Sequence, residues 1–169
     1  MRQRTPSIEA RTTENGQPFL FVAPADLVLL LTLLRDDEDL RFDALMDLTA
    51  YDLLKYPAKA PSDAICAVWL LWSHVHRHEL MVQTHAARSD CRLPTTSGVW
   101  PAAIYFEREV FDLYGVHFDG HPDLRRIMCP QDWVGHPLRK DYVYPATYHG
   151  VSHLRDGQHF ESQPAREAR

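Results

Sequence analysis

The sequence lacks the short patterns that mark the common nucleotide, nucleophile and zinc sites. It contains no G-x-G-x-x-G, Walker A, G-x-S-x-G or H-E-x-x-H pattern, the signatures of dinucleotide, triphosphate, serine-nucleophile and zinc sites. Its three cysteines, Cys66, Cys91 and Cys129, include no C-x-x-C pair, whereas iron–sulfur clusters and zinc ribbons need four ligands at recognisable spacing. We therefore expect no flavin, nicotinamide, quinone or metal site from this chain's own residues, and reduced thiols as in cytoplasmic proteins.

Long apolar runs and an excess of positive charge are missing as well. The longest apolar stretch, Leu27 to Leu34, is too short to span a bilayer. No apolar run near the N-terminus resembles a signal peptide. The net charge of −5 and the pI of about 6.0 do not favour nucleic-acid binding. Any association with a membrane is therefore expected to come through partner proteins.

The length and composition fit one globular domain with tails. The chain has 169 residues, of which 45% are hydrophobic and 24% charged, and both fractions are ordinary for a single packed core. We place the domain at residues 19–142, after a polar N-terminal extension at 1–18. Residues 143–169 carry a few aromatic side chains in a polar segment, which predicts a tail that orders on a partner subunit. A free, disordered tail is the alternative.

Apolar periodicity predicts a mixture of strands and helices. Leucines at three- and four-residue spacing indicate a helix from Pro24 to Arg35. Alternating or dense apolar residues indicate strands at 19–22, 41–51, 64–72 and around 80–84, the last two joined by a turn at His76 and Arg77. We expect the 64–72 strand to be buried on both faces. In the 41–51 strand one side is shared by Phe42, Ala44, Met46, Leu48 and Ala50. These elements predict an α+β fold, with a two-layer mixed β-sheet packed against helices and a long irregular C-terminal segment.

The stretch from Trp100 to Asp141 carries most of the information in the sequence. Its first half predicts a helix that begins at Pro101, with Ser97 as a possible cap, and ends at Gly115. Arg108 and Asp112 are four residues apart and are expected to pair along one helix face. The apolar stripe of this helix consists of Ala103, Phe106, Val110 and Leu113.

The second half of the stretch has little regular period but many aromatic, basic and proline residues. Two His-Pro pairs, His121-Pro122 and His136-Pro137, each precede a basic pair, Arg125-Arg126 and Arg139-Lys140. Proline restricts the residue before it, so both pairs stiffen the chain. A stiff cationic segment suits a fixed polar interface. The plain alternative is a surface loop with solvated charges.

Histidines raise two further possibilities. His74, His76 and His78 would share one face of a straight strand and could bind zinc, but the expected turn breaks that arrangement. A second group, made of His117, Asp119, His121 and His136, could suggest acid–base chemistry. No nucleophile, base and orienting group emerge together in the sequence. A free-standing histidine-based, metal-dependent enzyme therefore stays as an alternative of another class.

Several short sequence motifs in the Trp100–Asp141 stretch also resemble those of a known family. They are Glu107-Arg108-Glu109, Asp112-Leu113-Tyr114-Gly115, Phe118, Gly120-His121-Pro122-Asp123-Leu124-Arg125-Arg126-Ile127, and Trp133-x-Gly135-His136-Pro137-Leu138-Arg139-Lys140-Asp141-Tyr142. At these positions the chain resembles the NuoC, or 30-kilodalton, subunit family of proton-pumping NADH:quinone oxidoreductase, respiratory complex I. A looser match runs back to about Val22.

The resemblance implies a subunit without a redox centre of its own, in the peripheral arm of the complex on the cytoplasmic side of the bacterial inner membrane. It implies packing against the hydrogenase-like, D-like subunit that helps to form the quinone pocket, with B- and I-like subunits nearby. FMN, iron–sulfur clusters, NADH and quinone are implied for the complex and not for this chain. An equivalent subunit of a membrane-bound nickel–iron hydrogenase, or of a ferredoxin- or F420-linked relative, uses similar words and is the main alternative.

The residues expected to matter are structural or interface residues, and none is expected to be catalytic. They are Glu107, Arg108, Glu109, Asp112, Gly115, His121, Pro122, Arg125, Arg126, Trp133, His136, Pro137, Arg139, Lys140 and Asp141.

Overall fold

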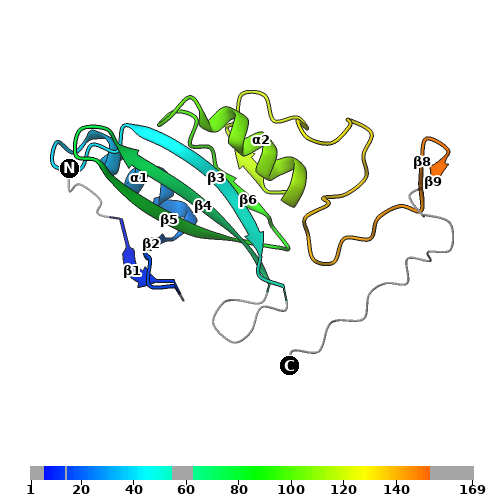
Figure 1. Ribbon diagram of the computed structural model, residues 1–169, viewed down its shortest axis with the longest axis horizontal. Helices are drawn as coiled ribbons and strands as arrows, with labels where there is room; N and C mark the ends of the chain where they lie inside the picture. Colours follow the sequence, from blue (N-terminus) through cyan, green and yellow to red (C-terminus); the bar gives the residue numbers. More distant parts are fainter. Residues whose placement is uncertain (1–5, 14, 55–62, 153–169) are drawn as a thin grey trace.

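The computed structural model describes residues 6–13, 15–54 and 63–152 (Figure 1). A five-stranded sheet has the order β1-β2-β5-β4-β3. Strand β2 runs parallel to β5, and the other neighbours are antiparallel. The sheet is therefore mixed, as expected. Its strands are β1 (Ile8–Thr12), β2 (Pro18–Val22), β3 (Ala44–Asp52), β4 (Ala64–Ser73) and β5 (His78–Ala87).

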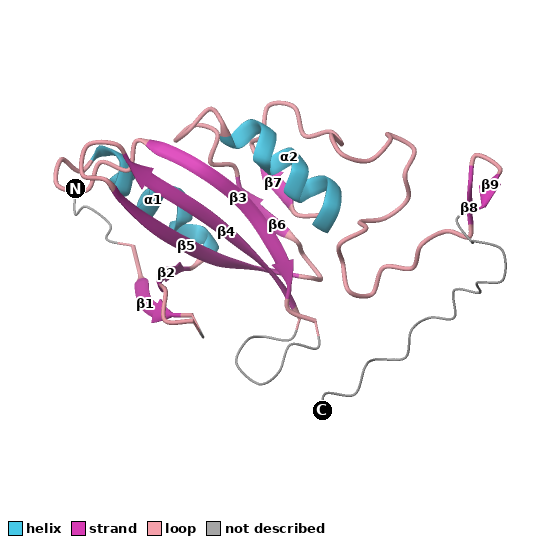
Figure 2. Ribbon diagram, in the orientation of Figure 1, coloured by secondary structure: helices cyan, strands magenta, loops and turns pink. Residues whose placement is uncertain are grey.

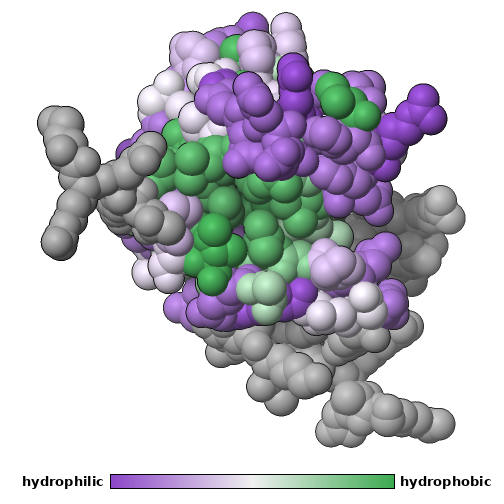
Figure 3. All heavy atoms as spheres, turned by 90° about the vertical axis from the view of Figure 1, so that its left-hand side faces the viewer, coloured by the Kyte–Doolittle hydropathy of each residue, from purple (hydrophilic) through white to green (hydrophobic). Residues whose placement is uncertain are grey.

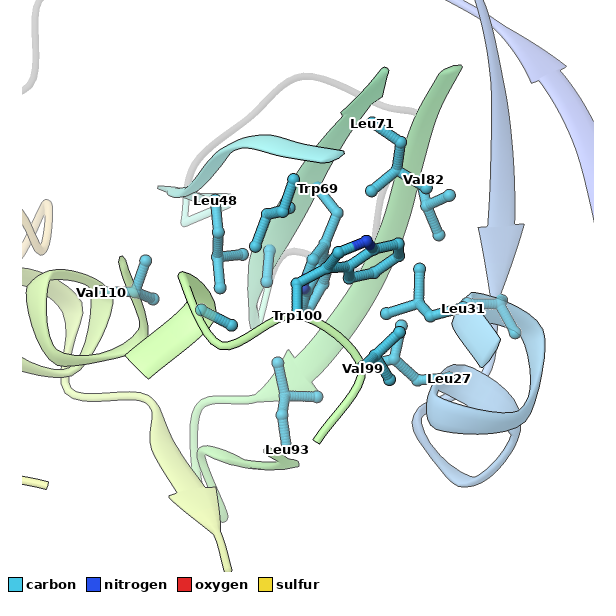
Figure 4. Close-up of a cluster of buried hydrophobic side chains, with 14 of the residues drawn as sticks. Leu27, Leu31, Leu48, Trp69, Leu71, Val82, Leu93, Val99, Trp100 and Val110 are labelled. Atoms are coloured by element: carbon cyan, nitrogen blue, oxygen red, sulfur yellow. The ribbon is translucent and has the colours of Figure 1, made fainter. Parts of the chain in front are cut away.

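Two helices form the second layer on one face of this sheet. A short 3-10 turn, η1 (Pro24–Asp26), leads into α1 (Leu27–Asp36), and α2 (Ala103–Tyr114) follows the sheet. Figure 2 shows both helices beside the same strands. The core lies between the layers, where side chains from the strands meet α1 and the start of α2 (Figure 4). Its labelled members include Leu31, Trp69, Leu71, Val82 and Trp100. The predicted two-layer α+β fold is confirmed.

Strand β4 shows how the pattern of the sequence selects the buried face. Ile65, Ala67, Trp69 and Leu71 alternate along the strand and are fully buried toward the helices, as side chains on one face of a strand do. Val68, Leu70 and Trp72 point to the opposite face and stay partly exposed. The expectation that this strand is buried on both faces is therefore wrong for its second half.

Strand β3 also departs from the predicted alternation. A register shift lies between Leu45 and Asp47, so the chain contains one extra residue there. Leu45, Leu48 and Ala50 face the core, whereas Met46 is 55% exposed. The prediction that Met46 shares the side of Leu48 and Ala50 is wrong, because the bulge moves its side chain to the outside.

The sheet begins earlier in the chain than the sequence suggested. Strand β1 lies within the range 1–18 and pairs with β2 through a turn at Gly16, whose φ is 82°. All five residues of β1 are exposed, so the sequence contains no apolar alternation that would predict this strand. Two short pairs complete the strands. Strand β6 (Arg92–Pro94) lies parallel to β7 (His117–Asp119), and β8 (Thr147–Tyr148) is antiparallel to β9 (Val151–Ser152).

The end of the molecule that carries α1 and the β4–β5 turn shows an apolar area framed by polar side chains (Figure 3). Elements at this end contribute half-buried or exposed apolar residues, among them Leu20, Leu33 and Leu80. Among the described residues, none of the helices is both long and apolar enough to cross a membrane. The expected tail at 143–169 falls mostly outside the described range, which ends at residue 152.

A candidate interface built on the end of helix α2

Helix α2 ends at Gly115, as predicted, and the segment that follows binds its last carbonyl groups. Gly115 has a φ of 73°, the left-handed conformation that commonly stops helices. The last carbonyls of a helix have no partner inside it. Here the irregular segment, defined as residues 120–146, supplies three partners. His136 Nδ1 donates to the Asp112 carbonyl (2.9 Å), the Leu138 N–H to Leu113 (3.0 Å) and Arg139 Nε to Tyr114 (2.6 Å).

The positive charge of Arg139 suits this position because the C-terminal end of a helix carries partial negative charge. His136 acts as a neutral donor. Burial lowers the pKa of this imidazole, with the cations Arg139 and Arg126 nearby also favouring the neutral ring. The predicted cap at Ser97 is wrong. Ala102 precedes the helix without a side-chain cap, and Ser97 instead contacts Thr95.

The Asp112 carboxylate is the centre of the site. Its side chain is fully buried, and Oδ2 accepts the backbone N–H groups of Ile127 (2.9 Å), Met128 (2.7 Å) and Cys129 (2.8 Å). Oδ1 accepts Arg126 Nη1 at 2.5 Å. Burial by itself raises the pKa of Asp112, but these donors outweigh it and the pKa lies below its usual range. One charged side chain of α2 therefore fixes four groups of the irregular segment.

The expected pair between Arg108 and Asp112 does not form. Arg108 instead donates to the carbonyls of Arg125 (3.1 Å) and Arg126 (3.2 Å). Arg126 reaches from the segment to Asp112 and also donates to the Gly135 carbonyl at 2.8 Å. Arg108, Arg126 and Asp112 thus connect helix α2 to the irregular segment. They do not connect one turn of the helix to the next. The local spacing rule missed this because it considers neighbours on the helix alone.

Glu107 anchors the other side of α2. It is fully buried and accepts hydrogen bonds from the Thr95 hydroxyl (2.6 Å), the Thr96 N–H (2.6 Å) and the Thr96 hydroxyl (2.7 Å). His121 Nε2 lies 4.0 Å from the same carboxylate and donates to the Ile104 carbonyl. Burial raises the pKa of Glu107, although the threonine donors and His121 oppose that shift. Glu107 therefore holds the chain before α2 and lies beside the first His-Pro pair after it.

A third cluster joins the irregular segment to the sheet. Asp52, at the end of β3, accepts Arg88 Nη1 at 2.5 Å and the Lys140 N–H at 2.8 Å. Arg88 also donates to Asp141 at 2.5 Å. Asp52 and Arg88 are not among the residues predicted from the sequence to matter. Asp52 follows Leu48 and Ala50 on the core side of β3. A carboxylate at a buried position of an alternating strand needs a partner, and this pattern could have pointed to Asp52.

The remaining expected residues have smaller parts. Arg125 pairs with the exposed Asp123, and the Trp133 ring lies 5.1 Å from that of Tyr148. Glu109 is exposed and makes no hydrogen bond or ion pair with the described residues. Pro122 is exposed and Pro137 is half-buried next to their histidines.

The other histidines in the described part of the chain do not assemble into a metal site. Three of them, from the β4–β5 turn, hold the loop after α1. His76 donates to the Glu38 carbonyl (3.0 Å), His78 to the Leu40 carbonyl (2.9 Å), and His74 pairs with Asp43 (2.8 Å). His117 contacts Asp119, while His121 binds the Ile104 carbonyl near the start of α2 and His136 binds the Asp112 carbonyl near its end. Within residues 6–13, 15–54 and 63–152, no three His, Cys, Asp or Glu side chains are arranged to hold a metal ion.

The fold and the site thus define an α+β domain that anchors a long irregular segment on the end of one helix. Residues 20–148 match the family described as "Respiratory-chain NADH dehydrogenase, 30 Kd subunit". The chain belongs to this family of respiratory complex I subunits, as the resemblance of its sequence words predicted.

Curated relatives agree with the family. The NADH-quinone oxidoreductase C subunit of Chloroherpeton thalassium is 40% identical over 120 residues, 70% of this chain and 47% of the relative. The C subunit of Salinispora arenicola is 36% identical over 148 residues, 86% of this chain and 59% of the relative. The chain therefore spans about half the length of these two relatives. The NADH-quinone oxidoreductase C/D subunit of Pseudomonas fluorescens is 41% identical over 141 residues, 82% of this chain and 24% of that protein.

Solved structures share the fold. The trypsin-resistant fragment (1-134) of Nqo5 has a TM-score of 0.60 at 27% identity, covering 69% of this chain and 89% of the fragment. A chain of an archaeal membrane-bound sulfane sulfur reductase has a TM-score of 0.61 at 24% identity, covering 82% of this chain and 78% of that one. The second likeness establishes the fold alone.

Proposed function

We propose that this chain is a non-redox structural subunit in the peripheral arm of a proton-translocating NADH:quinone oxidoreductase, where it braces the quinone-site, D-like subunit. One observation carries the proposal. The irregular segment directs Arg126, His136 and Arg139 inward to α2, yet leaves large apolar side chains in solvent, with Met128 at 62% and Val134 at 82% exposure. Clustered exposed apolar residues on an ordered segment are typical of a protein interface.

The same segment offers several such side chains. Beyond the two named above, Ile127, Leu138, Val143 and Tyr144 are exposed large hydrophobic residues. We infer that the internal hydrogen bonds fix the segment before it binds, which lowers the entropy cost of forming an interface. The sequence predicts that the cations make contacts within the loop or with the partner, whereas Arg126 and Arg139 contact the end of helix α2 in this chain.

The C/D protein of Pseudomonas fluorescens supports a D-like partner. By its name, that protein joins a C and a D part in one polypeptide, and it contains a region 41% identical to this chain. By analogy we propose the D-like subunit as the main partner here, with B- and I-like subunits nearby. FMN, iron–sulfur clusters, NADH and quinone then belong to other subunits, no catalytic centre lies in this chain, and the complex holds it at the cytoplasmic side of the membrane.

A related complex is the second candidate. The archaeal membrane-bound sulfane sulfur reductase contains a chain of the same fold, with a TM-score of 0.61. An equivalent position in a hydrogenase-type membrane complex would need the same anchored segment. Isolation from native membranes in mild detergent separates the two candidates. Flavin- and iron–sulfur-bearing subunits with NADH:quinone activity support the first, and a nickel–iron hydrogenase supports the second.

The proposal predicts that loss of the anchors reduces assembly and spares turnover. In Arg126→Ala the buried Asp112 carboxylate loses its cation, a change that costs about 3–5 kcal/mol for buried pairs. Arg139→Ala removes the side chain that donates to the Tyr114 carbonyl at the end of α2. Both variants should lower the amount of assembled complex in membranes several-fold, with little change in NADH:quinone turnover per assembled complex.

Two controls make this test specific. Arg125→Ala removes a cation whose side-chain partner is the exposed Asp123, so assembly should stay near wild type. Val134→Glu alters an exposed interface residue, so it should weaken co-purification of the D-like subunit without changing the unfolding midpoint of the purified chain. Normal assembly with lost turnover in Arg126→Ala would contradict the structural role.

A further inference from the structure

The face of the sheet opposite the helices carries an apolar patch. Leu70 and Trp72 of β4 point away from the core, because their neighbours Trp69 and Leu71 are fully buried beneath the helices. Met81 of β5 lies opposite Leu70 in the antiparallel register, and Met46 projects from the bulge of β3. We call these four residues, Met46, Leu70, Trp72 and Met81, the outer patch.

Two adjacent hollows lie on the outer patch. One has a volume of about 340 Å³ and is lined by Met46, Leu70 and Trp72 together with neighbouring residues. The other has a volume of about 270 Å³ and is lined by Met81, Gln17 and Pro18. Leu70 and Glu79 line both hollows. The two hollows are therefore neighbours that share one ridge.

The charge on this face is negative. Glu79 lies opposite Trp72, and Asp47 lies opposite Leu70. Both carboxylates are exposed, and neither makes a hydrogen bond or ion pair with the part of the chain that the structure describes. The cation Arg11, on the same side of the sheet, is already engaged by Glu9 and by the ring of Phe21. A ligand with positive charge is thus favoured.

The other boundary of the outer patch is polar and self-contained. Tyr51 donates to Gln83 at 3.3 Å, and Gln83 donates to the Met81 sulfur at 3.1 Å. Gln83 is buried, so this group separates the outer patch from the rest of the sheet face. The outer patch therefore lies at the end of β4 and the start of β5, beside the bulge of β3 and near the β4–β5 turn.

We propose that the outer patch docks an amphipathic helix of a partner protein, with lysine or arginine beside its apolar stripe. Two hollows on either side of one ridge suit two apolar side chains three or four residues apart on a helix. Lysine or arginine side chains flanking them would reach Glu79 and Asp47. Addition of a partner strand to β4 does not fit, because β4 is already paired with β3 along one edge and with β5 along the other.

This surface is separate from the interface proposed above. The irregular segment is tied to α2, on the helix-covered side of the sheet, whereas the outer patch lies on the opposite side, which neither of the described helices covers. The domain would then hold two partners on opposite faces. The proposal does not depend on the D-like subunit as occupant of the first interface.

A photo-cross-linking amino acid at Met81, in the full chain within native membranes, tests the proposal. We expect cross-links to one partner peptide with apolar residues at helical spacing and lysine or arginine beside them. The double charge reversal Asp47→Lys with Glu79→Lys should reduce the cross-linked yield about tenfold or more, as like charges then face each other. Asp90→Lys, a single charge reversal in the turn before β6 and half of that charge change, should leave the yield unchanged.

Several results would overturn the inference. These are cross-links to a second copy of this chain, to residues 153–169 of the same chain, or to an acidic segment, and a complete absence of cross-links in assembled complex. A yield that resists the double reversal would also contradict it. Co-purification of the D-like subunit is measured in the same samples. Because the reversed residues lie away from the irregular segment, that association should persist, which separates failure of this proposal from failure of the first.

Discussion

Gly115 shows how much one residue decides at the end of α2. Its φ of 73° suits glycine, and a Cβ added there would lie 2.5 Å from the His136 ring and 2.8 Å from the Arg139 guanidinium. Alanine would therefore be strained and would also displace two groups that bind the helix end. We expect Gly115→Ala to lower the free energy of unfolding by about 2–4 kcal/mol, measured by urea denaturation of the purified chain.

Gly98→Ala is the matched control. A Cβ at Gly98 meets no atom within 4 Å, and its φ is not in the left-handed range. This substitution should change the free energy of unfolding by less than about 1 kcal/mol in either direction. Equal losses in the two variants would show that the contacts around Gly115 do not hold the segment.

At the level of single residues, the sequence predicts what local rules control. Glycine as the stop of a helix follows from the chain near it. The partners of Asp112 do not, because Ile127, Met128 and Cys129 lie 15 to 17 residues away in a segment without period. Thr95 and Thr96 were missed as partners of Glu107 for a related reason, since a buried glutamate gives no sign in the sequence of what binds it.

At the level of elements, the predictions that were confirmed concern helices and strands with a buried face and a regular apolar pattern. Helix α1 and strand β4 have strong apolar patterns, so both appear close to their predicted positions. Strand β1 is exposed along its length, and β6 has three residues, so neither has a pattern to detect. The bulge in β3 breaks alternation in a way that composition alone does not reveal.

The attachment of the irregular segment to α2 makes its own prediction. Asp112→Asn keeps the size of the side chain but removes the charge that balances Arg126 and weakens acceptance of three backbone N–H groups. We expect a loss of about 2–4 kcal/mol in the free energy of unfolding at pH 7. Glu109→Gln, an exposed change on the same helix, should stay within about 0.5 kcal/mol of wild type. Similar values for both would contradict the role of Asp112.

At the scale of the whole molecule, two carboxylates far apart in sequence, Asp52 and Asp112, join the sheet, helix α2 and the irregular segment. The bond from the Lys140 N–H to Asp52 spans 88 positions, and the bond from Arg88 to Asp52 spans 36. Contacts of this separation follow from the topology of the sheet, so the sequence predicted an irregular segment but not where it would be held. The family motifs identify the residues of the segment, and the three-dimensional structure shows that two of its cations, Arg126 and Arg139, bind helix α2.

The same carboxylates determine how stability should depend on pH. In Asp52 and Asp112, hydrogen-bond donors outweigh burial and leave the pKa below its usual range, and Arg88 lowers the pKa of Asp141. A depressed pKa contributes stability that is present above the ordinary value of about 3.9 and lost as the pH falls through the folded value. Urea unfolding should therefore show a falling free energy below about pH 4, and Asp112→Asn should make that fall shallower.

Glu107 acts in the opposite direction. Burial raises its pKa in the folded chain, so the folded state binds its proton more readily than the unfolded state does, and stability gains as the pH falls toward the ordinary value of about 4.3. Glu107→Gln removes this gain, because glutamine does not titrate. As the pH falls from 7 to about 5, the free energy of unfolding of the variant should decrease relative to that of wild type. Urea unfolding at each pH measures this difference. A difference that does not change with pH over this interval would mean that Thr95, Thr96 and His121 stabilise the carboxylate enough to cancel its burial.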